Sequence, residues 1–509
     1  MPLDDSFFSR RQILKGSLAA SFIASAATAK AASGVSDSPV AQENSKPGNR
    51  DWQLTRVRIN SGQYRTSLIE GYCSDQSIST GEKLSIFVST DPARMFTLDI
   101  YRMGYYNGAG ARKMASYGPL RGAPQPVPEM GEAPARLREC QWAPSVEFSI
   151  PSDWLSGVYL GKLTTIPESK SDPYWQSYVI FIVRDQRPAQ ILFQCSDNTW
   201  QAYNRWPVNE SLYTHPDGAH APDVAVSFDR PYGKYNQIFD HPLSVGSGEF
   251  LLWEYPLCYW LEQHGYDVTY GSNRDTVDPA FITRCQNFIS VGHDEYWDIA
   301  QYHAAEQAID AGVNYLWLCG NSVFIVSPFE ASSRGVPQRI ISRAGCYGPL
   351  RDDEIQSYAS LFAGLTDKAP DERKIIGARS VVPFNGGGDW TCVNPQHWLF
   401  ANTGMKQGDS IPGLVGWEHH GEPDLERDGL EVLAEGSIWS GGVQEGRYAA
   451  TIFPGPKGNF VFNAATIFWA QGLSSPPGHI LPWSHGSRPS GPDVRVQQMT
   501  KNLLDRMRE

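Results

Sequence analysis

Four residues whose side chains can do chemistry each come soon after a short apolar run of the chain: Tyr203, His293, Glu295 and Asn321. A phenol, an imidazole, a carboxylate and an amide are groups that ligate metal ions or transfer protons. Glu295 also precedes a helix start, where the positive end of the helix dipole favours an ionised carboxylate. These residues form the first candidate site, either for metal ligation or for acid–base chemistry.

The apolar runs before these residues are expected to be buried strands, at 189–195, 287–291 and 314–318. Between the last two runs, Asp298 suits the N-cap of a helix that continues to about residue 311, and Gly312 suits its end. A strand, a helix and a second strand form a parallel unit, and ligands bind beyond the carboxyl ends of parallel strands. The side chains that follow these strands are therefore expected to meet at one edge of a sheet.

Each candidate also has a purely structural interpretation. Asp294 is expected to have a structural role, because Asp before a helix commonly acts as a cap. His293 alone is equally compatible with a hydrogen-bonded core histidine, and Gly320-Asn321 also suits a tight turn. The expected meeting of strand ends favours a functional role for His293 together with Glu295.

Other motifs carry less information. The glycine run 386–388 lacks the strand and spacing of a dinucleotide-binding fingerprint and predicts a flexible turn. His419 and His420 are adjacent on an expected loop, and we expect them to face solvent rather than to bind metal. The sequence contains neither a G-x-S-x-G elbow nor an H-E-x-x-H motif, which argues against an α/β-hydrolase and against a zinc protease of that class.

The elements that must position these residues divide the chain into two regions. Short segments of period two, separated by Gly and Pro clusters, predict an antiparallel, immunoglobulin-like β-sandwich over 51–185. Alternating strand and helix signals predict an α/β, mainly parallel-sheet region of the glutamine amidotransferase or Rossmann kind over 186–509. The fold class is thus α+β multidomain, with helices expected near 247–264 and 494–508, and with 335–450 left unassigned.

The N-terminus carries a twin-arginine signal motif, Ser9-Arg10-Arg11-Gln12-Ile13-Leu14-Lys15. A weakly apolar run and small residues follow it, so we expect a signal peptide over 1–31 and a flexible linker over 32–50. The expected partner during export is the twin-arginine translocase. The expected location is the periplasm or the outside of the cell.

Composition excludes some classes of protein. A net charge of −12 and the lack of a basic stripe argue against nucleic-acid binding. The chain has 8 cysteines without any C-x-x-C pair, which argues against a zinc cluster; Cys73 with Cys140 is the first pairing to test for a disulfide. Aromatic residues make up 12% of the chain, which favours β-rich packing or a site for sugars or flat ligands.

Several motifs, spread in order from about residue 66 to the end, resemble the large-subunit family of N,N-dimethylformamidase, an amide hydrolase. They are Ile69-Glu70-Gly71-Tyr72, Ile100-Tyr101-Arg102-Met103-Gly104-Tyr105-Tyr106, Thr199-Trp200-Gln201-Ala202-Tyr203-Asn204, Gly292-His293-Asp294-Glu295-Tyr296-Trp297 and Gly320-Asn321. The resemblance implies a mononuclear iron held by two tyrosines and a glutamate, with Tyr203 and Glu295 at ligand positions. It also implies that His293 and Asn321 position water or the amide.

The motifs do not fix the second tyrosine ligand. The matching region reads Val226-Ser227-Phe228-Asp229-Arg230-Pro231-Tyr232, with a phenylalanine near the position where a phenol is wanted. Tyr232 is therefore expected to complete the iron site with Tyr203 and Glu295, and Tyr235 is the other substitute.

The expected function is that of an exported hydrolase of amide or other C–N bonds, with a small-molecule amide as substrate and iron as cofactor. Its expected catalytic residues are His293, Glu295 and Asn321. Two alternatives remain open at this point. One is a non-catalytic envelope protein that binds glycan or a protein partner, and the other is a metal-free hydrolase with His293 as base. An oligomer is compatible with either.

Overall fold

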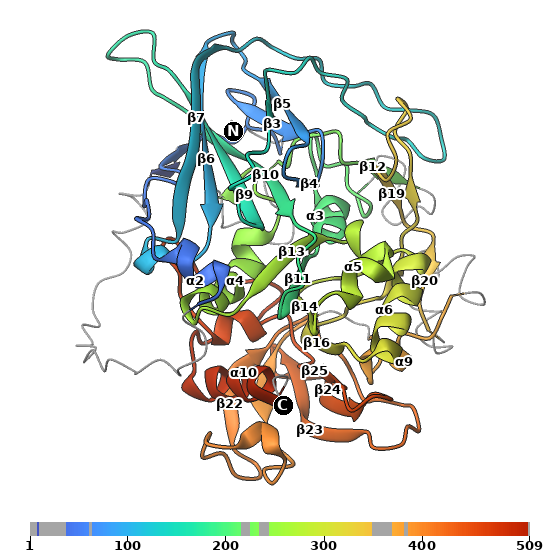
Figure 1. Cartoon of the computed structure of the whole chain (residues 1–509). Coiled ribbons are helices and arrows are strands. Elements are labelled where there is room, and N and C mark those ends of the chain that lie inside the picture. The colour runs from blue at the N-terminus through green and yellow to red at the C-terminus, as the bar shows by residue number, and fades with distance from the viewer. Residues whose placement is uncertain are drawn as a thin grey trace.

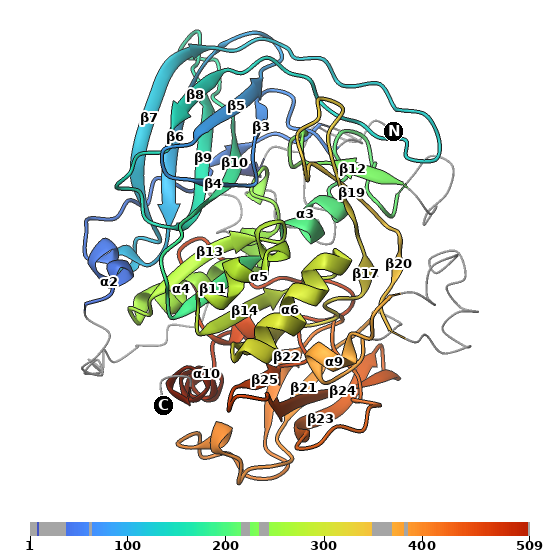
Figure 2. The ribbon, with the colours of Figure 1, turned by 45° about the vertical axis from the view of Figure 1, so that its right-hand side comes forward.

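The computed structural model describes residues 8–9, 37–60, 64–214, 224–233, 244–348, 369–380 and 385–506. The fold is α+β and consists mainly of strands, arranged in several sheets of mixed direction. Figures 1 and 2 show a β-rich N-terminal part next to a layered part in which helices lie beside a central sheet. Within the described ranges, no helix is long and apolar enough to cross a membrane.

Two sheets form the β-rich part, with strand orders β4-β10-β9-β6-β7 and β3-β5-β8. The strands are β3 Glu70–Cys73, β4 Ser77–Ser79, β5 Lys83–Ser89, β6 Met95–Met103, β7 Ala111–Arg121, β8 Val146–Ser149, β9 Gly157–Thr165 and β10 Gln176–Arg184. Alternate residues such as Leu84, Leu98 and Val179 are buried in one shared cluster. The strands lie within the region 51–185 in which segments of period two predicted a β-rich fold.

A seven-stranded sheet forms the layered part, in the order β13-β11-β14-β16-β25-β24-β23. Its first five strands pair in parallel, whereas β24 pairs antiparallel with both β25 and β23. The strands are β11 Ile191–Cys195, β13 Val268–Ser272, β14 Asn287–Gly292, β16 Asn314–Cys319, β23 Glu431–Ser440, β24 Val443–Pro454 and β25 Phe460–Asn463. The antiparallel hairpin begins in the stretch for which the sequence predicts no elements.

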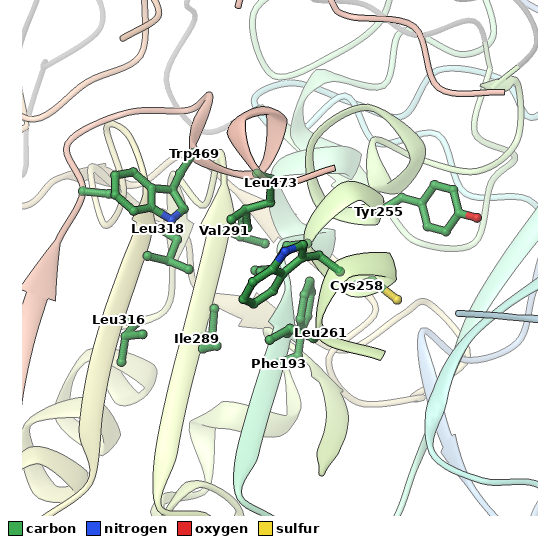
Figure 3. Close-up of a cluster of buried hydrophobic side chains, with 14 of the residues drawn as sticks. Phe193, Tyr255, Cys258, Leu261, Ile289, Val291, Leu316, Leu318, Trp469 and Leu473 are labelled. Atoms are coloured by element: carbon green, nitrogen blue, oxygen red, sulfur yellow. The ribbon is translucent and has the colours of Figure 1, made fainter. Parts of the chain in front are cut away.

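Helices cover both faces of this sheet because successive strand residues point to opposite sides. On one face, Phe193, Ile289 and Leu316 belong to the same buried cluster as Leu261 of α4 (Tyr255–Gln263) and Trp469 of η8 (Trp469–Gly472); Figure 3 shows these side chains together. On the other face, the strands pack against α6 (Ile299–Ala311) and α5 (Pro279–Thr283). Each large apolar side chain buried in this way contributes about 1.5–3 kcal/mol.

The helix predicted between two strands is present as α6. The side chain of Asp298 accepts a hydrogen bond from the Ala300 N–H, and Gly312 ends the helix with φ 104°, in the left-handed region that suits glycine. The helix expected near 247–264 consists of a π-helical turn, η4 Phe250–Glu254, followed by α4. The C-terminal helix is α10, Val494–Arg506.

The remaining elements are short. They are α3 Asp197–Tyr203, β12 Ala225–Ser227, η5 Asp275–Val277, β15 Tyr296–Trp297, β17 Ile325–Val326, β18 Phe329–Glu330, β19 Ile340–Ser342, β20 Gly345–Cys346, α9 Arg373–Ile376, β21 Gly388–Thr391, η7 Trp398–Phe400 and β22 Ser410–Val415. The β-rich part also contains η2, Tyr106–Gly108.

The segment predicted as a flexible linker contains a helix, so this prediction is wrong for part of 32–50. Helix α2 spans Pro39–Asn44, capped by Ser38, and Val40 is fully buried. The Asn44 amide donates to the Glu262 carboxylate at 2.7 Å, which ties the helix to the layered part. The predicted signal peptide, 1–31, lies outside the described residues, apart from β1 (Phe8–Ser9), which pairs with β2 (Arg56–Val57).

A buried ion pair joins the two parts of the protein. Arg102 of β6 makes two hydrogen bonds, of 2.8 and 2.9 Å, to the carboxylate of Glu262 in α4, and both side chains are fully buried. The hydroxyls of Tyr106 and Tyr270 complete this network. The β-rich part is therefore a structural partner of the central sheet rather than a loosely tethered module.

All eight cysteines are buried and free. The first pairing to test, Cys73 with Cys140, forms no disulfide.

Candidate functional site

The strand ends bring the predicted site residues together, as parallel pairing requires. Strand β11 leads into α3, which ends at Tyr203, and β14 leads directly into His293 and Glu295. Strand β16 leads into Gly320 and Asn321. Because β11, β14 and β16 pair in parallel, their carboxyl ends lie at the same edge of the sheet.

Glu295 is the centre of the site. Its carboxylate is buried, and it accepts a hydrogen bond from Tyr203 Oη on Oε2 at 2.6 Å and one from Tyr213 Oη on Oε1 at 2.9 Å. The two phenol oxygens are 3.4 Å apart, and the two rings stack with centroids 4.8 Å apart. Two phenol oxygens and one carboxylate, each able to ligate a metal ion, therefore lie together at Glu295.

The backbone around Glu295 is fixed by neighbouring elements. The Glu295 N–H donates to Thr199 Oγ1 of α3 at 3.0 Å, which sets the position of Tyr203 relative to Glu295. Asp294 accepts hydrogen bonds from Gln194, Asn273 and Ser290, so its side chain fixes the backbone that follows β14. Asp294 thus has the structural role expected for it, although as a buried acceptor and not as a helix cap.

The surroundings of Glu295 have opposing effects on the pKa of its carboxyl. Burial raises the pKa of the Glu295 carboxyl, and the hydrogen bonds from Tyr203 and Tyr213 oppose this effect. Arg343, whose guanidinium lies 5.5 Å from the centre of the Tyr213 ring, also favours the ionised carboxylate. Burial, and next the charge of Glu295, raise the pKa of both phenols well above the ordinary value.

His293 lies between two carboxylates. Its Nε2 is 3.4 Å from Glu295 Oε2 and 3.7 Å from Glu418 Oε1. Burial, with smaller contributions from His485 and His420, lowers the pKa of His293 to about 3. The imidazole is therefore neutral at neutral pH.

Glu418 is a site residue that the sequence did not single out. It is buried, and burial, followed by the charge of Glu295, raises its pKa well above the ordinary value. Its backbone carbonyl oxygen lies 2.1 Å from where a Cβ on Gly320 would stand, so residue 320 must be glycine for the two segments to approach this closely. The run Trp417-Glu418-His419-His420 contains three side chains that can do chemistry, but it lies in 335–450, where the sequence predicted no strand or helix to position them.

His419 and His420 are buried, so the prediction that they face solvent is wrong. His420 Nε2 accepts the Ser322 N–H at 2.9 Å, and its Nδ1 lies 2.7 Å from Asn463 Oδ1. Since Nε2 accepts from a backbone N–H, the proton is assigned to Nδ1. Burial lowers the pKa of His420 to about 4, which keeps the ring neutral. His420 thereby fixes the turn that carries Asn321.

Asn321 approaches the site from a left-handed backbone position, with φ 50°. It lies close enough to Glu418 to act on the pKa of that carboxyl. Neither atom of its amide makes a hydrogen bond of normal geometry within the described part of the chain, and the same holds for Glu418 Oε2. Buried polar atoms without partners are rare, and they are expected where a ligand or water binds.

Tyr232 does not take the place predicted for it. It lies beside Trp200, with ring centroids 6.3 Å apart, in a cavity of about 30 Å³ that Asp197 and Arg339 also line. Tyr213 occupies the position on Glu295 instead, because the loop after α3 returns it to the Tyr203 ring. Tyr235 lies outside the described residues. The sequence offered one indication of Tyr213: it is a tyrosine ten residues after the candidate ligand Tyr203.

The side chains at this site offer mainly oxygen atoms as possible metal ligands. Within the described ranges, no group of three or more His, Cys, Asp or Glu side chains is placed to hold a metal ion. Two phenols and one carboxylate remain as candidate ligands, with a neutral imidazole and a second buried carboxyl beside them.

A mainly parallel sheet with polar residues at its strand ends, combined with a β-rich N-terminal part, defines an α+β protein. Comparison with family models identifies the family: residues 97–482 match the model for N,N-dimethylformamidase beta subunit-like proteins, C-terminal region. The chain belongs to this family. A comparison with curated proteins found no match.

Proposed function

We propose that this protein is an exported hydrolase of amide or other C–N bonds that uses a mononuclear iron held by Tyr203, Tyr213 and Glu295. The observation that carries the proposal is the pair of stacked phenols on the two oxygens of one buried carboxylate. Membership of the dimethylformamidase-like family supports a hydrolase. The resemblance of the strand-end motifs to those of the family enzyme suggests iron.

The residues fit a hard cation. Ferric iron prefers anionic oxygen ligands, and the site offers two phenols and a carboxylate. In the absence of a cation, the phenol protons satisfy the carboxylate oxygens, and binding would release those protons. The unpartnered polar atoms of Asn321 and Glu418 support a ligand beside these oxygens.

When bound, the metal supplies Lewis acidity towards an amide carbonyl and a water molecule. His293 is the candidate base: its Nε2, 3.4 Å from Glu295 Oε2, takes the proton that the attacking water loses and passes it to the leaving nitrogen. The carboxyl of Glu418, whose pKa is raised by burial, lies 3.7 Å from the same nitrogen and helps to position the imidazole. Asn321 donates its amide hydrogens to the substrate carbonyl. The burial of the site favours a small-molecule amide.

We propose a finer architecture and a location as well. The two facing sheets support an immunoglobulin-like sandwich at the N-terminus. The five parallel strands with helices on both faces support a sheet of the glutamine amidotransferase or Rossmann kind. The motif at residues 9–15 supports export through the twin-arginine translocase to the periplasm or beyond.

The test is to purify the exported protein, measure bound metals by elemental analysis, and assay the amine released from short N-alkyl amides. We expect about one iron per chain and measurable hydrolysis, both lost in Glu295→Gln, which keeps the shape of the side chain. Wild-type protein without metal, or with hydrolysis that survives chelation, would exclude the iron mechanism. The second of these outcomes would favour a metal-free hydrolase with His293 as base.

One observation favours the non-catalytic alternative. The side chains of Trp439 and Trp483 are 50% and 54% exposed, and exposed aromatic rings are suited to glycan binding. Glycan binding that persists in Glu295→Gln, in a protein without amide hydrolysis, would support a glycan-binding envelope protein instead.

A further inference from the structure

Arg230 is a buried arginine that directs all its hydrogen-bond donors at helix α3 and the loop that follows it. Its side chain is 2% exposed. Nε donates to Gln201 Oε1, one terminal nitrogen donates to the carbonyls of Trp206 and Glu210, and the other donates to those of Gln201 and Asn204, all at 2.8–3.0 Å. A guanidinium has five N–H donors, so every one of them is used.

The loop that Arg230 fills is the one that carries both phenols. It leaves α3 at Tyr203 and returns at Tyr213, and the Leu212 N–H donates to the Ala202 carbonyl at 2.9 Å, which closes the loop at its base. The four carbonyl groups bound by Arg230 belong to residues of α3 and of the loop itself. The guanidinium therefore fixes the path of the backbone that determines the spacing of the two phenols.

Arg230 is buried without a direct ion pair to any described residue. No carboxylate lies within ion-pair distance of its guanidinium among the residues that the structure describes, and an unpaired buried charge is costly. Burial lowers its pKa to about 10, which still leaves the group charged at neutral pH. Carbonyl and amide oxygens bind the guanidinium directly, and the charge of nearby Glu210 also favours its charged form, so Arg230 is held by the loop and holds it in turn.

The segment that carries Arg230 is itself held by the β-rich part. The Asp229 carbonyl accepts the Cys140 N–H at 2.7 Å, and the Asp229 carboxylate pairs with Arg339 at 2.7 Å. Arg339 in turn donates to the Cys73 carbonyl and to Gln76. A continuous set of contacts thus runs from the β-rich part through Arg230 to the two phenols.

We infer that Arg230 is a positioning residue, which sets the spacing of Tyr203 and Tyr213 on Glu295 through the backbone of the loop between them. The inference rests on the proposed metal site for its functional meaning. The spacing of the phenols can also be measured without any metal.

The decisive variant is Arg230→Lys, which keeps the charge but supplies three donors in place of a planar group of five. We expect iron affinity to fall at least about tenfold, as for other groups that support metal ligands. The visible phenolate-to-iron charge-transfer band should weaken or shift. The matched control is Arg102→Lys, another fully buried arginine with several hydrogen bonds, which lies in β6 and binds Glu262 of α4. It should lose stability and yet keep the iron affinity and the band.

Gln201→Met is the milder second variant, because it removes one acceptor of Arg230 and keeps the volume of the side chain. It should change the iron affinity in the same direction by a smaller factor, and it decides the question if Arg230→Lys does not fold. The metal-free measurement is the yield of the oxidative dityrosine cross-link between Tyr203 and Tyr213, mapped by mass spectrometry, which we expect to fall in both variants.

The outcomes separate this inference from the proposed function. Wild-type protein that binds no iron, with a cross-link yield that still depends on Arg230, would remove the metal site and retain the positioning role. Wild-type iron affinity, band and cross-link yield in both Arg230→Lys and Gln201→Met would overturn the positioning role.

Discussion

Tyr203 and Tyr213 are ten residues apart in the chain, yet their rings stack with centroids 4.8 Å apart and their hydroxyls share the two oxygens of one carboxylate. The two rings would not both face Glu295 if the loop between them followed another path. The candidate site is therefore a property of a loop and two strand ends together.

The first prediction separates Tyr213 from Tyr232 as the second phenol. Tyr213→Phe should lower iron affinity by at least about 100-fold, since loss even of groups that only support ligands typically costs about 10- to 100-fold. Tyr232→Phe is the matched control, because Tyr232 belongs to the same part of the chain but lies beside Trp200. Titration of both purified variants with iron gives the answer; a larger loss in Tyr232→Phe would reverse the assignment.

The second prediction concerns the turn that carries Asn321. His420→Gln keeps an acceptor near the position of Nε2, whereas His420→Asn keeps a polar group only near the position of Nδ1. The asparagine variant should lose about 1–3 kcal/mol of stability, because the buried Ser322 N–H is left without an acceptor. Its kcat should fall more than that of the glutamine variant. Equal behaviour of the two variants would mean that His420 does not position Asn321.

The third prediction concerns the buried ion pair between the two parts of the protein. Glu262→Gln should cost about 3–5 kcal/mol, because it leaves the Arg102 charge buried and unpaired. The double variant Arg102→Met/Glu262→Met should recover most of that loss. Urea unfolding of the three proteins is the measurement. A single variant as stable as wild type would show that the pair does not join the two parts.

The fourth prediction is a pH dependence. Burial raises the pKa of Asp197 to about 7, above its ordinary value of about 3.9. The folded state then binds the proton more tightly than the unfolded state, so Asp197 makes the protein less stable as pH rises from about 4 to about 7. Each pKa unit of difference between the folded and the unfolded state corresponds to about 1.4 kcal/mol.

Asp197→Asn should remove this contribution. The stability of the variant relative to wild type should increase steadily between about pH 4 and about pH 7 in urea unfolding. Asp153→Asn, at an exposed position, serves as the control. A difference between Asp197→Asn and wild type that does not change with pH would contradict the raised pKa.

The fifth prediction concerns export. Replacing Arg10 and Arg11 by lysine should leave the full-length precursor in the cytoplasm, because the arginine pair is the recognition element of the signal. Cell fractionation and immunoblotting measure the distribution, with a protein that carries a general secretory signal as control. Normal export of the lysine variant would remove the twin-arginine assignment.

The sequence predicted the parts of the fold in which local pattern and tertiary structure agree. Strand β14, helix α6 and strand β16 follow from hydrophobic runs, an Asp cap and a glycine stop, and they place His293 and Asn321 at one edge of the sheet. Helix α2 was missed because its stability comes from tertiary contacts, such as the bond from Asn44 to Glu262, which a short polar segment does not reveal.

The predictions that failed at the site depended on long-range packing. Tyr213 reaches Glu295 along a loop that is bound by Arg230, a residue further along the chain, and no local pattern encodes that contact. His420 was assigned to an exposed loop because two adjacent histidines look polar, yet a buried acceptor was needed for the Ser322 N–H. Such pairings follow from the arrangement of elements and not from their sequences.

The eight buried thiols have a consequence for where this protein can work. Burial raises the pKa of Cys195, Cys258 and Cys319 above the ordinary value, so hardly any of the reactive thiolate forms, and oxidants have no access to the sulfur. Burial thus protects these thiols once the chain has folded. None of these thiols forms a disulfide that a reductant could cleave, so the cysteines of the folded protein do not depend on an oxidising compartment.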